Sequence, residues 1–92
     1  MSSTFPKDPA ELLDYTWDWT PWLAEVSDTI SSATVVATDG LTAVGEPSVN
    51  GALVTQRVSG GDVGKLSAVT CQITTASGLI AERSIHLKIA QR

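Results

Sequence analysis

The sequence predicts an all-β fold, an immunoglobulin-like antiparallel β-sandwich of six to seven strands. Val, Ile and Thr are frequent among its 92 residues, and these residues favour pleated, half-buried surfaces. Apolar and polar residues alternate along several segments, as expected for strands with one buried face. Turn signals recur at short intervals, at Asp39-Gly40, Gly45-Glu46-Pro47, Asn50-Gly51, Gly60-Gly61-Asp62 and Ser77-Gly78. Short strands separated by such turns are typical of a sandwich.

The first expected strand covers residues 13–19, because its apolar and aromatic side chains occupy every second position. Residues 20–25 break the alternation and predict a turn or one short helical turn. Further strands are expected over residues 28–38, 41–44, 52–58, 66–75 and 79–90, with an additional short one near 63–65. Residues 1–10 carry two prolines and are expected to form an N-terminal arm. Residues 11–92 then make up the sandwich domain.

Two of these strands show which face is buried. In residues 66–75, Val69, Cys71 and Ile73 share one face. In residues 79–90, Ile85, Leu87 and Ile89 point one way, and the alternate positions Ser84, His86 and Lys88 point the other way. Because successive side chains of a strand point to opposite faces, the apolar sets are expected to form the core.

Size and charge exclude several classes of function. A chain of 92 residues forms one small domain with a thin core. Its net charge of −4 and scattered basic residues disfavour binding to nucleic acid or to an anionic membrane surface. Cys71 is the single cysteine, so we expect no intramolecular disulfide and assembly in a reducing cytoplasm. No apolar run reaches the ~18 residues that span a bilayer.

The reactive residue types form no catalytic pattern. Asp14 and Asp18 share a strand face, but four residues of strand separate them by about 13 Å, too far for a glycosidase pair. His86 and Cys71 are expected on a polar and an apolar face, so they do not form a nucleophile and base. Residues 60–65 contain glycines and a lysine without the Ser or Thr of a phosphate loop. We therefore expect a protein without catalytic residues, metal or cofactor.

The aromatic residues are the most informative feature. All five lie between positions 5 and 22: Phe5, Tyr15, Trp17, Trp19 and Trp22. In one interpretation, the rings of the first strand simply fill the core. In the other, some of them contact a partner, because Trp and Tyr dominate interface hot spots. We predict Tyr15, Trp17, Trp19 and Trp22 as partner-binding residues, with a carbohydrate-stacking platform as a further alternative.

Charge is also distributed unevenly along the chain. Residues 1–30 contain one lysine and six acidic residues, a net charge of −5, whereas residues 56–92 contain five basic and two acidic residues, a net charge of +3. Either the first and last strands lie close together and pair their charges, or the polarity faces a partner. The sequence leaves both explanations open.

Several segments resemble a known family. They are Lys7-Asp8-Pro9-Ala10-Glu11-Leu12-Leu13-Asp14-Tyr15-Thr16-Trp17-Asp18-Trp19, then Trp22-Leu23, Asp28-Thr29-Ile30, Ile73-Thr74-Thr75, Gly78 and Glu82-Arg83-Ser84-Ile85. Together they resemble the small fiber–tail adaptor proteins of tailed bacteriophages, over residues 6–90. The resemblance implies an immunoglobulin-like structural protein of the virion that links the tail to receptor-binding fibers. It also implies that the strand carrying Tyr15, Trp17 and Trp19 is the docking element.

The resulting expectation is a non-enzymatic virion protein, assembled in the host cytoplasm, that joins tail or portal components to tail fibers through protein–protein contacts. Its partners would be other phage structural proteins of the tail, portal, fiber or capsid, and it would be present in several symmetric copies. Two alternatives remain at this point, a capsid decoration protein and a carbohydrate-binding module.

Overall fold

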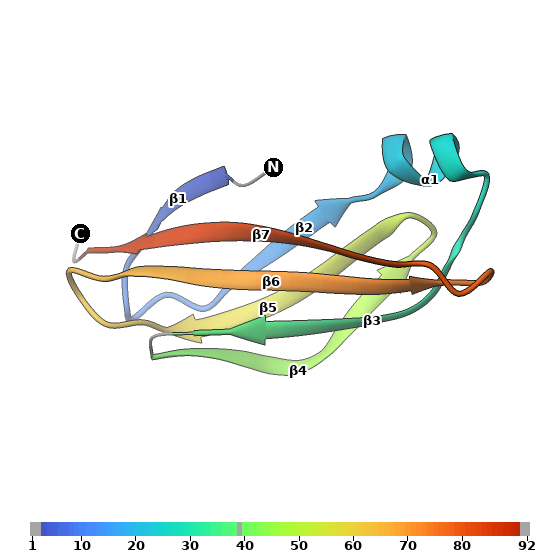
Figure 1. Cartoon of the computed structure of the whole chain (residues 1–92). Helices are drawn as coiled ribbons and strands as arrows, with labels where there is room; N and C mark the ends of the chain where they lie inside the picture. Colours follow the sequence, from blue (N-terminus) through green and yellow to red (C-terminus); the bar gives the residue numbers. More distant parts are fainter. Residues whose placement is uncertain (1–2, 39, 91–92) are drawn as a thin grey trace.

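The computed structural model describes residues 3–38 and 40–90, with side chains from Phe5 onward. Two sheets pack face to face, and a short helix lies at the opposite end of the molecule from the end of β7 (Figure 1). In chain order the elements are β1 (Ser3–Lys7), β2 (Leu13–Asp18), α1 (Thr20–Val26), β3 (Ile30–Ala37), β4 (Leu41–Asn50), β5 (Leu53–Gly60), β6 (Leu66–Thr75) and β7 (Ile80–Ile89). The strands form one sheet in the order β1-β7-β6-β3 and another in the order β2-β5-β4.

The strand order confirms the predicted immunoglobulin-like sandwich. The order β3-β6-β7 corresponds to strands C, F and G of an immunoglobulin domain, and β2-β5-β4 corresponds to B, E and D. All neighbouring strands pair antiparallel except β1, which pairs parallel with β7. The first strand therefore belongs to the sheet of β7, whereas in constant-type immunoglobulin domains it extends the sheet of the second strand.

The core lies between the two sheets. Val69, Cys71 and Ile73 on β6 are fully buried, as the alternation predicted. Leu87 and Ile89 on β7 are buried as well, and Ile85 packs against them from its half-buried position. The opposite sheet contributes Val54 and Val58 from β5 together with the rings of β2. Alternate residues of facing strands thus fill one thin apolar layer.

The structure differs from the prediction at three places. The additional strand is not at residues 63–65, which form a turn, but at residues 3–7 of the expected arm. The strand expected over residues 41–44 continues to Asn50 as β4, across a register shift between Val44 and Ser48. Residues 20–26 form two turns of helix, with Pro21 in the first turn, where its missing N–H costs no intrahelical bond.

A buried lysine connects β1 to the rest of the sandwich. Lys7 has no exposed surface, and its ammonium group donates to the carbonyl oxygens of Asp8 at 3.0 Å, Glu11 at 2.7 Å and Gly60 at 2.7 Å. Residues 8–11 form a turn in which the N–H of Glu11 donates to the carbonyl of Asp8, and the Glu11 carboxylate accepts from the N–H of Asp8. Pro9 at the second position suits this turn, since its φ is preset. The segment that opens with Lys7-Asp8-Pro9 therefore joins β1 to β2 by a fixed connection.

Candidate functional site: the aromatic segment and the grooves beside it

The four predicted docking rings occupy two different environments. Trp17 and Trp19 belong to the core, with 5% and 1% of their surface exposed. Tyr15 and Trp22 are half-buried and pack against the core from its edge. The alternation of β2 explains the first difference, because Leu13, Tyr15 and Trp17 all face inward but the burial increases along the strand.

The buried Trp19 supports the rings and charges around it. Its ring meets that of Trp22 edge to face, with the centroids 5.9 Å apart. The Arg83 guanidinium lies over the Trp19 ring, 4.7 Å from the centroid, which is a cation–π arrangement. Burial raises the pKa of the nearby Cys71 thiol, although a hydrogen bond with Trp19 partly opposes this shift. Trp22 therefore lies at the surface packed against Trp19, whose ring also contacts Arg83.

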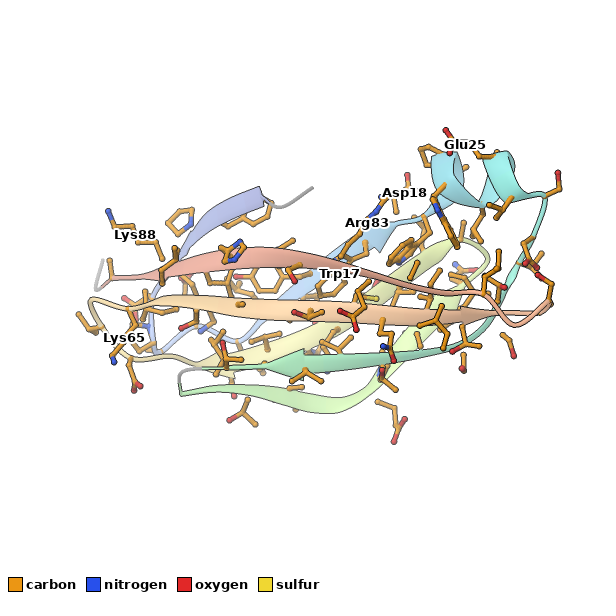
Figure 2. All side chains as sticks on the ribbon, viewed as in Figure 1. Trp17, Asp18, Glu25, Lys65, Arg83 and Lys88 are labelled. Atoms are coloured by element: carbon orange, nitrogen blue, oxygen red, sulfur yellow. The ribbon has the colours of Figure 1, made fainter. Side chains whose placement is uncertain are left out.

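A groove of about 320 Å³ opens between β2 and β7. It is lined by Phe5, Asp14, Tyr15, Thr16, Trp17, Arg83, Ser84 and Ile85. The rings of Phe5 and Tyr15 lie 6.2 Å apart at its β1 side. At the opposite side Arg83 reaches across from β7, and its Nη1 donates to the Asp18 carbonyl oxygen at 3.4 Å (Figure 2). The groove between the two sheets is thus open to solvent and is bounded at one end by β1 and at the other by Arg83.

The wall of this groove contains an unusual polar group. The Trp17 indole N–H is buried and finds no hydrogen-bond acceptor within residues 3–38 and 40–90. A buried donor without an acceptor costs about 1–3 kcal/mol, so such groups are rare in folded proteins.

A second and larger groove, of about 790 Å³, lies beside α1. Its apolar lining comes from Leu23 and Ala24 of the helix, Ile30 at the start of β3, and Val49 and Ala52 around the β4–β5 turn. Trp22 is the neighbour of Leu23 on the same short helix. The α1 end of the molecule therefore combines an aromatic ring with an apolar hollow.

The acidic residues of the first third are engaged in local contacts. Asp14 forms an ion pair with Arg57 on the neighbouring strand, at 2.9 Å, and this hydrogen bond lowers the pKa of the Asp14 carboxyl. Hydrogen bonds from Thr20 lower the pKa of Asp18. Together with the contact between Arg83 and Asp18, these pairings support the explanation that acidic and basic segments lie side by side.

The reactive side chains remain apart. Cys71 points into the core opposite Arg83, whereas His86 pairs with Ala68 on the outer face of the same sheet. In the part of the chain that the structure describes, no three of the residues His, Cys, Asp and Glu lie together in a group that could hold a metal ion. None of the helices described there is long and apolar enough to cross a membrane.

Comparison with known proteins agrees with these observations. None of the curated proteins compared with the chain matches it. A protein-family model described as "Podophage GP4 fiber-tail adaptor protein gp77" matches residues 7–88, from the buried Lys7 nearly to the end of β7. This match confirms the resemblance seen in the segments around residues 7–19 and 82–85, and it supports a structural role in the phage tail and a place in the virion. The chain therefore belongs to the podophage fiber–tail adaptor family.

Proposed function

We propose that this protein is a non-enzymatic adaptor that joins tail or portal components to tail fibers by protein–protein docking, in several symmetric copies per particle. The observation that carries the proposal is the division of the aromatic segment into two buried and two half-buried rings. Trp17 and Trp19 anchor the segment in the core, and Tyr15 and Trp22 present aromatic surface. Preformed aromatic surface is favourable for docking because little side-chain entropy is lost on binding.

An adaptor needs at least two contact surfaces, and the two grooves offer them. Tyr15 lines the groove between β2 and β7, whereas Trp22 packs on Trp19, and its helix neighbours Leu23 and Ala24 line the larger groove. Six residues of chain separate the two rings, and three of them lie along β2, where each residue advances the strand by about 3.3 Å. Contacts at these two places can be made by two different partners.

The proposal is tested by measuring incorporation of variants into phage particles. Trp22→Ala is expected to lower incorporation at least tenfold while the purified domain keeps its cooperative thermal transition, since Trp22 is half-buried. Ile80→Ala is the matched control, because Ile80 is a large apolar side chain with 65% exposure that lies outside the aromatic segment. Trp19→Ala is unsuitable as a docking variant, because truncating a buried Trp costs about 3–5 kcal/mol.

The same particles separate the alternatives. An adaptor at a tail of cyclic symmetry is expected in roughly six to twelve copies, whereas a decoration protein is expected in hundreds. Binding of the isolated domain to a glycan array, abolished in Trp22→Ala, would instead indicate a carbohydrate-binding module. Normal incorporation of Trp22→Ala together with Tyr15→Ala would contradict docking through the aromatic segment.

A further inference from the structure

One strand position of the sandwich is vacant. Constant-type immunoglobulin domains have a four-stranded sheet in which the first strand pairs with the second. Here β1 pairs with β7 instead, so the sheet β2-β5-β4 has three strands, and no other strand of the described residues lies on the outer side of β2. The backbone polar groups on that side of β2 are positioned to pair with an incoming strand.

The outer edges of the two sheets differ in how well they are protected. β1 has five residues and contains Pro6, which has no N–H to donate. β3 and β4 both have register shifts, and that of β4 includes Gly45 and Pro47. β2 pairs with β5 in unbroken register over all six residues and contains no Gly or Pro. Bulges, prolines and charged side chains are the usual devices that block edge pairing. β2 carries the charged residues Asp14 and Asp18 but has neither a bulge nor a proline, so its main-chain groups are the most regularly arrayed of the four edges.

The groove beside this edge fits the inner face of such a strand. Its walls are four consecutive residues of β2 and three of β7. Alternate side chains of an added strand would enter it, because side chains of a strand alternate between two faces. Trp17 and Ile85 contribute apolar surface to its lining.

The outer face of β2 indicates the charge of the partner. Asp14, Thr16 and Asp18 point outward along it. Asp14 is already paired with Arg57, so Asp18 is the carboxylate of this face that has no ion pair among the described residues. Cross-strand neighbours of opposite charge stabilise a sheet, and like charges destabilise it. The outward residues of an added strand are therefore expected to be Lys, Arg or Thr.

We propose that an extended segment of a different virion subunit adds to the outer edge of β2 as a fourth strand. Its inward side chains, small or β-branched and apolar, enter the groove between β2 and β7, and an outward basic side chain lies beside Asp18. Main-chain hydrogen bonds supply the affinity and the groove supplies the specificity, as in other strand-addition complexes. The inference rests on the proposed function, because it names how one of the adaptor's partners binds.

Backbone hydrogen exchange of the wild-type chain, purified and in assembled particles, tests this inference. Amides of residues 13–18 that face the open edge are expected to exchange at least roughly tenfold more slowly in particles than in the purified protein, because a strand hydrogen bond protects an amide. Docking through side chains alone would leave these amides fast. That result, in particles that contain the chain, would overturn strand addition but leave the adaptor function intact. Absence of the chain from particles would overturn both.

A pair of variants on β7 tests the groove itself. Ile85→Lys places an inward charge in the groove, which is a device that blocks strand addition, whereas His86→Lys adds the same charge on the outer face of the same strand. Ile85→Lys is expected to lower incorporation at least tenfold, and His86→Lys to leave it unchanged, with thermal unfolding as the check of folding. Equal incorporation of two folded variants would overturn the inference. Protection of residues 13–18 in a purified dimer would also overturn it, because the occupant would then be a second copy.

Discussion

Replacing Lys7 by Met is expected to destabilise the domain and to release β1. Met keeps most of the length and volume of the side chain but removes the ammonium group, whose three hydrogen bonds to carbonyl oxygens measure 2.7, 2.7 and 3.0 Å. Each hydrogen bond to a charged group contributes about 1.5–3 kcal/mol, so the gross loss is about 5–9 kcal/mol. The carbonyls of Asp8, Glu11 and Gly60 lose a donor at the junction of β1, the turn and β5.

The substitution also removes the free-energy cost of burying the Lys7 ammonium group. Burial lowers the pKa of Lys7, although the charges of Glu11 and Asp8 partly oppose the shift, so the folded protein holds the ammonium at a cost. The effective penalty of burying one ion is several kcal/mol, and Met does not incur it. Subtracting this penalty leaves a net destabilisation of about 2–4 kcal/mol. For a domain of this size, that corresponds to a fall in Tm of roughly 10–25 °C.

Thermal unfolding followed by circular dichroism measures the effect, and Lys88→Met is the matched control. Lys88 is exposed and lies on β7, the strand that pairs with β1, so it undergoes the same substitution without loss of buried hydrogen bonds (Figure 2). Hydrogen exchange should show faster exchange in residues 3–7 than in β6 of the Lys7→Met variant. A fall in Tm no larger than that of Lys88→Met would refute the reasoning that the buried lysine holds β1 in place.

Three further predictions concern the turns, the acid response and the single thiol. Gly61→Ala is expected to lower Tm clearly more than Gly51→Ala, because both positions have positive φ but an added Cβ at Gly61 would lie 2.7 Å from Ile89, whereas Gly51 faces open space. The hydrogen bond with Arg57 lowers the pKa of Asp14 in the folded protein, so this ion pair contributes its full stability above pH 3.8 and loses it as the pH falls toward the lower folded pKa. Asp14→Asn should therefore flatten the fall of Tm over that pH range. Cys71 is buried and its pKa is raised, so a thiol reagent should modify it only in denaturant; rapid modification of the native protein at neutral pH would contradict the described core.

The limits of sequence reasoning are clearest at the N-terminus. Residues 3–7 carry no alternation and include Pro6, so nothing local marks them as a strand. Their pairing with β7, some eighty residues later, exists only because the tertiary structure brings the two segments together. The burial of Lys7 has the same origin, since a lysine is ordinarily exposed unless partners satisfy it.

The aromatic segment shows a second limit. Its clustering is visible in the sequence, and the alternation along residues 13–19 placed Tyr15, Trp17 and Trp19 on one face. Which rings are covered depends on Arg83, Cys71 and β5, which come from distant parts of the chain. Sequence alone therefore identified the segment but could not divide it into buried and half-buried rings.

What the sequence determined by itself was the all-β sandwich and the inward face of β6. These features follow from period-two alternation and turn residues, which act over a few neighbouring positions. Only the tertiary structure decided that β1 joins β7, that the edge of β2 is left without a strand, and that a groove opens beside it. Strand pairing and groove shape depend on contacts between segments far apart in the chain, and local patterns do not encode which distant edge a segment will meet.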